Sequence, residues 1–370
     1  MNLSDDHGAL DAMEGAIPSF LAASLASDEH GVLTPDEEHQ VRMTLVYRVK
    51  PMLEMLKKTV HDLFSVEKAR DGEHKVKVTR FGGWFLRCLR SEIMDIFEMF
   101  PLSKFNPYFD TFLMAVNRHG MMLGEFHIRT ARGENVPHLV NRLNQCVSEI
   151  RQEFLSPDFR RRLRDYRRPI KKNYESLMQY FKRLFGRHSR MMIIRLDLSY
   201  KQQYRRGMTS ETVIQHRQAM LSDLNAGTFG PMQGYAARLE MGMRKGYHSH
   251  WVIFFDGNGN WMDTEVAMQI GQHWDKVITE GLGSHYNCNA RKERYQEKNI
   301  CFLGLIHHTD GDARVGLEKF AKYITEPDEL LRLSVPGIRS LWKGHASEPP
   351  SRPRPGRPRS PGKGDSQWLS

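Results

Sequence analysis

Two histidines separated by a single residue carry the clearest chemical signal in this sequence. His248 and His250 lie in the stretch from Tyr247 to Asp256, whose apolar and aromatic residues predict a β-strand. Side chains on a strand alternate between its two faces, so both imidazoles would project from the same face. Imidazole is a common ligand of divalent metals, and the pair therefore predicts half of a metal site. A structural or surface role for the pair is the alternative.

Glu240 is the expected third ligand of this site. A second strand is predicted over 235–241, and the glycine-containing turn 242–246 would join the two strands as a hairpin. In one possible register, paired residues of the two strands have numbers whose sum is even. Glu240 then lies beside His248 or His250, on the same face of the hairpin. The odd register would place the apolar neighbours of Glu240 there instead, so the pattern favours the even register. These three ligands would leave coordination positions open for water and a phosphate oxygen.

Tyr323 is the candidate nucleophile. It lies in a helix predicted over 314–325, with Lys319 four residues before it and Lys322 next to it. Cations beside a phenol favour the phenolate and also attract a phosphate group. The spacing therefore predicts Tyr323 as the catalytic residue, with Lys322 and Lys319 offsetting the developing charge. The alternative is that the Tyr323 ring simply anchors the helix by packing.

The elements that would position these groups are strands alternating with helices. Strands are predicted over 191–200, 235–241, 247–256 and 300–307, and helices over 209–225, 263–281 and 314–325. This order, with a hairpin between the first two helices, predicts an α+β fold: a small antiparallel sheet with helices packed on one side.

Residue 186 is the expected start of this domain, which would run to 345. Before it, apolar residues recur at helical spacing over 41–185 and predict a mainly helical, basic region. Residues 1–40 are acidic and 346–370 are rich in Pro and Arg, so both are predicted to be disordered tails. The last segment also resembles part of a minor-groove AT-hook, with an incomplete core.

Charge favours a polyanionic partner. The chain has 370 residues and a net charge of +10, although residues 1–41 contain nine acidic residues and no Lys or Arg. The remainder is therefore strongly positive, and this favours nucleic acid as a partner. The densest run of positive residues supplies the candidate DNA-binding residues. The alternative is that this run is only the solvent-exposed face of a helix. They are Arg160, Arg161, Arg162, Arg164, Arg167, Arg168, Lys171 and Lys172.

Composition also predicts a cytoplasmic protein with no membrane contact. The sequence contains no long apolar run and no secretory signal. The four cysteines, Cys88, Cys146, Cys288 and Cys301, are scattered without the spacing of a zinc site. We therefore expect buried, reduced thiols.

Three segments, taken in order, resemble the HUH superfamily of DNA-nicking enzymes that initiate rolling-circle replication. They are Arg190 to Ser199, Glu240 with Gly246 to Trp251, and Phe320 to Ile324. Within that superfamily the match is closer to the prophage-associated YfjJ/YagK type, which is grouped with the replication proteins of filamentous phages (inoviruses). The resemblance implies a palm-like sheet of the HUH/RRM kind.

The resemblance also implies a mechanism. His248 and His250, with Glu240 as third ligand, would bind Mg²⁺ or Mn²⁺, and Tyr323 would attack DNA. A covalent 5′-phosphotyrosyl intermediate and a free 3′-OH would result. No GxxxxGK[ST] motif occurs, so host helicase and polymerase would be the partners. Related tyrosine motifs often have a second Tyr where Lys319 stands and a Lys where Glu326 stands.

Other readings remain open from the residues alone. Tyr295 and Tyr286 are alternatives for the nucleophile. Tyr235, Tyr247 and Trp251 could stack unpaired bases, although core packing is the simpler role. The chain could instead be a prophage DNA-binding regulator without nicking activity. It could also be a zinc hydrolase that uses His307 or His308 as an extra ligand.

Overall fold

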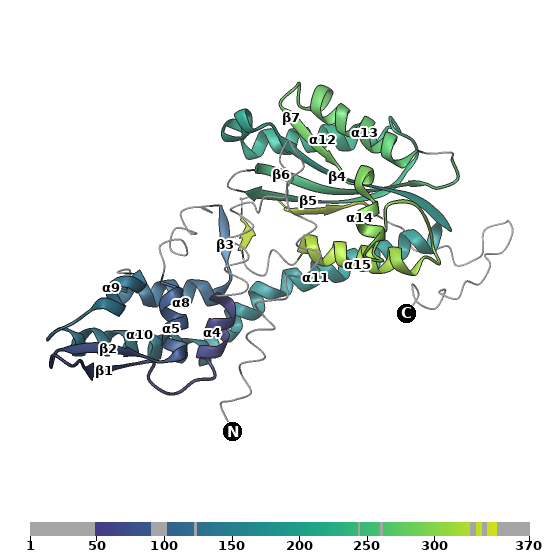
Figure 1. Ribbon diagram of the computed structural model, residues 1–370. Helices are drawn as coiled ribbons and strands as arrows, with labels where there is room; N and C mark the ends of the chain where they lie inside the picture. The colour runs from purple at the N-terminus through teal and green to yellow at the C-terminus, as the bar shows by residue number, and fades with distance from the viewer. Residues whose placement is uncertain are drawn as a thin grey trace. The chain divides into compact units, whose positions relative to one another are not determined.

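The chain divides into two compact units, and the division falls inside one helix. The computed structural model describes residues 49–89, 102–121, 124–242, 245–259, 262–325, 331–334 and 339–345. The first unit comprises residues 1–169 and 329–332, and the second comprises 170–328 and 333–370. Helix α11 (Pro157–Arg187) contains the division at Pro169, so the second unit begins earlier than the expected residue 186 (Figure 1). The predicted tails 1–40 and 346–370 lie outside the described residues.

The first unit contains a β-hairpin that the expectation of a mainly helical region did not include. Strands β1 (Phe64–Lys68) and β2 (His74–Val78) pair antiparallel. Short strand β3 (Ser103–Phe105) pairs with β9 (Leu331–Leu333). The helices of this unit are α4 (Lys50–Leu56), α5 (Arg80–Arg87), α8 (Pro107–Arg118), α9 (Gly124–Thr130), α10 (Val136–Leu155) and the start of α11.

The second unit is built on an antiparallel sheet, as the sequence predicts. Its strands are β4 (Arg190–Tyr200), β5 (Met232–Gly242), β6 (Gly246–Asp256), β7 (Gly283–Asn287), β8 (Gly304–His307) and β10 (Leu341–Lys343). Its helices are α12 (Ser210–Asn225), α13 (Asp263–His273), α14 (Glu293–Gln296) and α15 (Gly311–Thr325), with short turns η2 (Gln202–Gly207), η3 (Trp274–Ile278) and η4 (Asn289–Arg291). The strand order is β10-β5-β6-β4-β7, and β8 also pairs with β4.

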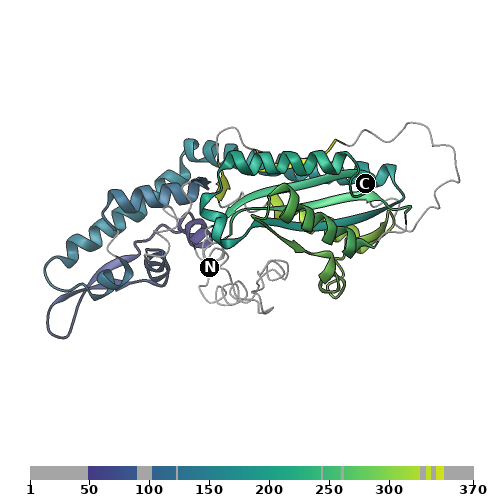
Figure 2. The ribbon, with the colours of Figure 1, turned by 90° about the horizontal axis from the view of Figure 1, so that it is seen from above.

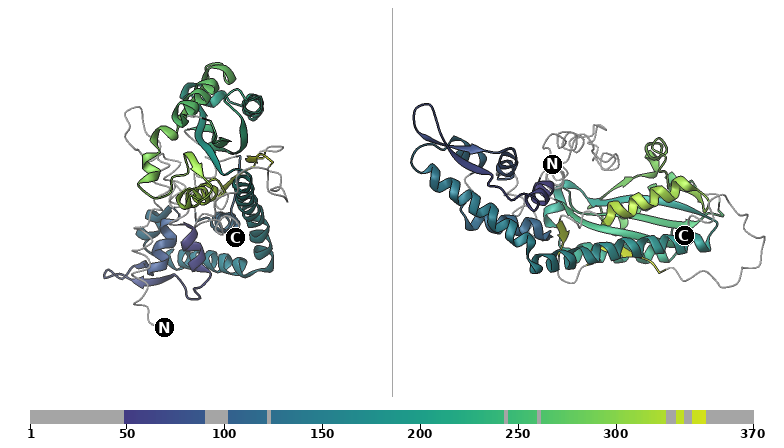
Figure 3. Two further views of the ribbon diagram at one scale, coloured as in Figure 1. Left: turned by 90° about the vertical axis from the view of Figure 1, so that its right-hand side faces the viewer. Right: turned by 90° about the horizontal axis from the view of Figure 1, so that it is seen from below.

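Helices cover both faces of this sheet, so the expectation that they pack on one side is wrong. Helices α12 and α13 pack on the face that carries Leu196, Leu239 and Trp251, which form one apolar core (Figure 2). On the opposite face, α11 places Phe181 against Phe254 with ring centroids 5.5 Å apart, and α15 crosses the same face (Figure 3). The physical reason is that β6 is buried along nearly its whole length, and a strand buried on both faces needs cover on both.

Two other expectations concern the whole chain. No helix within the described ranges is long and apolar enough to cross a membrane. The four cysteines are free thiols, of which Cys88, Cys146 and Cys288 are buried and Cys301 is half-buried. The expectation of buried thiols thus holds for three of the four, and Cys301 departs from it.

Candidate metal centre and tyrosine

The β5–β6 hairpin has the even register that the sequence predicts. Glu240 faces His248 and Arg238 faces His250. The turn returns into β6 at Gly246, whose φ of 59° suits glycine because other residues rarely adopt this conformation. Since opposed residues of an antiparallel pair share a face, the carboxylate and both imidazoles project to the same side of the sheet.

Glu240, His248 and His250 form a group that could hold a metal ion. One ligand atom from each residue lies within 4.8 Å of the other two, and all three side chains are buried. The nearest carboxylate oxygen of Glu240 is 3.8 Å from Nε2 of His248. Mixed nitrogen and carboxylate ligands suit several divalent ions, so the group itself does not identify the metal.

Hydrogen bonds leave the same atom of each imidazole for this group. Nδ1 of His248 lies 3.0 Å from the carbonyl oxygen of Gly246, and Nδ1 of His250 lies 2.7 Å from Oδ1 of Asp197. If each Nδ1 carries the proton and donates, each Nε2 keeps its lone pair. Burial, with the nearby His250, lowers the pKa of His248 to about 3, so its imidazole is neutral at physiological pH. The two Nε2 atoms and the Glu240 carboxylate are therefore suitable ligands for a divalent metal ion.

Tyr323 of α15 lies at this group. Its hydroxyl is 3.2 Å from Nε2 of His250, and the two ring centroids are 5.1 Å apart. The tyrosine side chain is half-buried. The structure therefore brings the predicted nucleophile and the three predicted ligands together, although Tyr323 lies 73 residues after His250 in the chain.

Asp197 is a site residue that the sequence analysis did not single out. It lies on β4, directly opposite His250 of β6. Burial raises the pKa of Asp197, but the nearby His250 and Arg195 outweigh it and hold that pKa well below its usual range. The carboxylate is therefore charged and can fix the orientation of the His250 ring. The alternation of polar and apolar residues in β4 could have revealed it, since Asp197 is on the polar side.

Arg195 is the second residue that the sequence analysis missed. Its side chain is only 4% exposed, and it donates a hydrogen bond of 2.8 Å to the Tyr295 hydroxyl. The guanidinium carbon lies 5.3 Å from the ring centroids of both Phe320 and Tyr323. Burial lowers the pKa of Arg195, but Tyr295, Cys288 and Asp197 outweigh it, so the group stays charged. A fixed positive charge thus lies beside the Tyr323 ring.

The two predicted lysines differ in their surroundings. Lys322 is exposed and forms an ion pair of 2.9 Å with Glu318, one turn before it on α15. Lys319 is half-buried and precedes Tyr323 by one helical turn. The buried charge that contacts the Tyr323 ring comes from Arg195 instead.

The alternative nucleophiles differ from Tyr323 in their surroundings, and the alternative ligands lie outside the ligand group. Tyr295 is buried and bonded to Arg195, whereas Tyr286 is exposed. His307 faces Arg190, seven residues along β4 from Asp197, which is roughly 23 Å at about 3.3 Å per residue. Neither His307 nor His308 belongs to the ligand group, so the geometry gives no support to their use as extra ligands.

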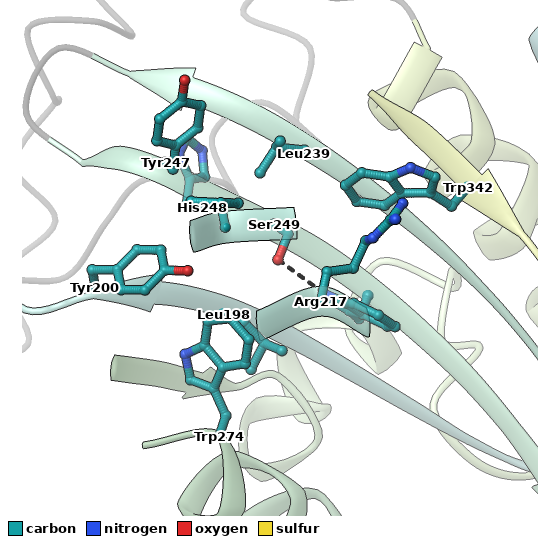
Figure 4. Close-up of a pocket in the computed structure, with 11 residues that line it drawn as sticks. Leu198, Tyr200, Arg217, Leu239, Tyr247, His248, Ser249, Trp274 and Trp342 are labelled. Carbon is teal, nitrogen blue, oxygen red and sulfur yellow. Dashed lines mark hydrogen bonds between the residues drawn. The ribbon is translucent and has the colours of Figure 1, made fainter. Parts of the chain in front are cut away.

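The opposite face of the sheet carries an apolar pocket. Figure 4 shows Tyr247, Trp274 and Trp342 lining it, together with Arg217. The guanidinium of Arg217 stacks 4.4 Å from the centroid of the Trp342 ring. Tyr247 and Trp251 are buried here, so their simpler role is packing. The third aromatic candidate, Tyr235, stacks on Trp251 with ring centroids 5.9 Å apart.

The predicted DNA-binding run lies along α11 and is largely exposed. The exposed members are Arg160, Arg161, Arg164, Arg167, Arg168, Lys171 and Lys172, whereas Arg162 is half-buried. Some of the charge is balanced locally, because Arg162 contacts Asp158 and Glu153, and Lys171 lies 3.7 Å from Glu175. The division at Pro169 places Lys171 and Lys172 in the second unit.

Comparisons with protein-family profiles, curated proteins and solved structures give no match for this chain.

Proposed function

We propose that this protein is a metal-dependent enzyme that nicks and rejoins a DNA strand through a phosphotyrosine intermediate, and so initiates rolling-circle replication of a phage or mobile element. The observation that carries the proposal is the position of the Tyr323 hydroxyl, 3.2 Å from Nε2 of His250, at the edge of the Glu240, His248 and His250 group. A nucleophile beside divalent-metal ligands suits phosphoryl transfer. The resemblance to HUH enzymes supports the same assignment.

The chain's own residues have distinct roles in this reaction. Glu240, His248 and His250 would hold Mg²⁺ or Mn²⁺, which supplies a Lewis acid that polarises a non-bridging phosphate oxygen. The Tyr323 oxygen attacks phosphorus in line and loses its proton, while the bond from phosphorus to the 3′ oxygen breaks and that oxygen takes up a proton. Because the phosphoester bond is conserved as phosphotyrosine, the 3′-OH can later reverse the step without ATP.

The positive charges near Tyr323 have a supporting role. Arg195 lies within cation–π distance of the phenol ring and would stabilise negative charge that develops on its oxygen. Lys322, next to Tyr323, and Lys319, one turn before it, remain candidates for the same role. Host helicase and polymerase would act after the nick.

The decisive experiment is a search for a covalent protein–DNA adduct. The full chain is incubated with Mn²⁺ and single-stranded DNA from the region that flanks its gene, and the products are separated under denaturing conditions. We expect an adduct that disappears in Tyr323→Phe and in His250→Ala but survives in Tyr286→Phe and Tyr295→Phe. An adduct that survives Tyr323→Phe would assign the nucleophile to another residue.

A DNA-binding regulator without nicking activity is the second candidate, and the exposed basic run of α11 favours it. If no adduct forms with any DNA or metal tested while the chain still binds DNA, this function replaces the first. In the full chain, Arg164→Glu with Arg168→Glu should weaken binding in either case, because both side chains are exposed on α11. Dependence on Zn²⁺ without DNA cleavage would favour a hydrolase of another kind.

A further inference from the structure

A row of side chains crosses the metal-binding face of the sheet from strand to strand. His250 of β6 faces Asp197 of β4. Asp197 in turn faces Tyr286 of β7. Neighbouring strands lie about 4.8 Å apart, so the Tyr286 backbone is roughly 10 Å from that of His250, on the same face. Tyr286 therefore lies beside the ligand group, on the strand at the end of the sheet order.

Tyr286 is exposed to solvent. It is 39% exposed, whereas Tyr295, the next tyrosine along the chain, is 8% exposed and bonded to Arg195. An exposed aromatic ring presents a flat apolar surface to solvent. Such a ring next to a phosphoryl-transfer site is suited to stack on a base.

Two arginines accompany Tyr286. Arg291 and Arg294 are exposed and lie on η4 and α14, the turn and short helix that follow β7. Burial and Cys288 raise the pKa of Tyr286, and Arg294 and Arg291 act in the opposite direction. The segment also contains acidic Glu293 and Glu297, while Lys292 is bound to Asp263 at 2.9 Å.

We propose that Tyr286, Arg291 and Arg294 form a binding subsite for single-stranded DNA, in which an unpaired base stacks on Tyr286 and adjacent phosphates contact the two guanidinium groups. The inference rests on the proposed function, because Tyr286 would hold the strand that Tyr323 attacks. A single strand fits better than a duplex, since paired bases present their edges and not their faces. Arginine suits phosphate because its planar fork can donate two hydrogen bonds.

The test is a binding measurement in which no cleavage can occur. Fluorescence anisotropy follows the full chain as it binds fluorescein-labelled oligo-dT in EDTA. We expect Tyr286→Ala to weaken binding by roughly 5- to 100-fold, the usual loss for one stacked base, and Tyr286→Phe to bind like the wild type. Arg291→Gln with Arg294→Gln should weaken binding and reduce its dependence on salt.

Lys276→Gln provides the matched control. Lys276 is exposed on η3, which packs on the opposite face of the sheet, so its loss should leave affinity unchanged. Thermal unfolding of every variant checks that the fold is intact. Equal affinity of Tyr286→Ala and the wild type would overturn the stacking role. Losses as large in Tyr286→Phe or in Lys276→Gln would overturn it too.

The failure of this subsite can be distinguished from the failure of the proposed function. A wild-type protein that binds oligo-dT through Tyr286 but forms no adduct would refute nicking and leave the subsite standing. An adduct that depends on Tyr323, together with binding that ignores Tyr286, would refute only the subsite. Preference for duplex DNA, or for oligo-U over oligo-dT, would show that single-stranded DNA is the wrong ligand.

Discussion

Asp197 holds His250 through a contact of 2.7 Å between its Oδ1 and the imidazole Nδ1, across the pairing of β4 with β6. The carboxylate thereby fixes both the ring orientation and the nitrogen that remains for a ligand. Partners of this kind matter for metal affinity nearly as much as the ligands themselves.

Replacement of Asp197 should therefore weaken metal binding. We expect Asp197→Ala to lower the affinity for Mn²⁺ by roughly 10- to 100-fold, as measured by isothermal titration calorimetry on the full chain. Asp223→Ala is the matched control, because Asp223 contacts His273 at the same distance of 2.7 Å but outside the ligand group. Equal losses in the two variants would contradict an orienting role specific to Asp197.

His248 should make the metal-free protein less stable as the pH falls. Its pKa is lowered from 6.5 to about 3 by burial, so below about pH 6.5 the unfolded chain binds a proton that the folded chain does not. The stability that the neutral ring contributes is present above pH 6.5 and is lost as the pH falls toward 3, by up to about 1.4 kcal/mol per pH unit.

The measurement is denaturant unfolding in EDTA at several pH values, with His248→Asn for comparison. The difference in unfolding free energy between the wild type and the variant should shrink as the pH drops from 7 to 5. If the two pH profiles are parallel, the His248 ring titrates alike in both states and the prediction is wrong.

Loss of Arg195 should destabilise the second unit. Arg195→Met removes a buried charge and leaves the Tyr295 hydroxyl without its donor, at a cost of roughly 3–5 kcal/mol. Chemical denaturation gives the value. Arg206→Met, at an exposed position on η2, is expected to change stability by less than about 0.5 kcal/mol. Similar effects at both positions would argue against the buried network.

Gly246→Ala should strain the start of β6. At φ 59° an added Cβ costs about 1–2 kcal/mol, and it would also lie 3.1 Å from Cβ of Arg205. Gly311→Ala is the control, since nothing lies within 4 Å of its added Cβ at the start of α15. We expect a lower melting temperature for Gly246→Ala and an unchanged melting temperature for Gly311→Ala. An unchanged melting temperature for Gly246→Ala would contradict the prediction.

The ligand group of the candidate site could be predicted from the sequence because its geometry is local. The hairpin register follows from alternation in two adjacent strands, so Glu240 facing His248 is determined by residues close together in the chain. Asp197 and Arg195 depend instead on the pairing of β4 with β6, which lie far apart in sequence. The sequence shows that both residues lie on the polar side of β4, but it does not show which residues they contact.

The missed elements are short or depend on distant contacts. Strand β7 contains Gly, Ser, His, Tyr and Asn and has no apolar alternation, yet it pairs with β4 at the edge of the sheet. Strand β10 is only three residues long. The sequence does indicate that helices cover both faces of the sheet. The run from Trp251 to Phe255 is apolar without interruption, as in strands that are covered on both sides.

Strand β4 is paired along both of its edges, with β6 on one side and with β7 and β8 on the other. Its amides should therefore be among the slowest in the unit to exchange hydrogen with solvent. Asp197 and Arg195 lie on this strand, whereas Tyr323 lies two residues before the end of α15, where helices fray. Asp197, which orients a candidate metal ligand, thus lies in backbone expected to open late, whereas the candidate nucleophile lies near a helix end, where opening is expected earlier.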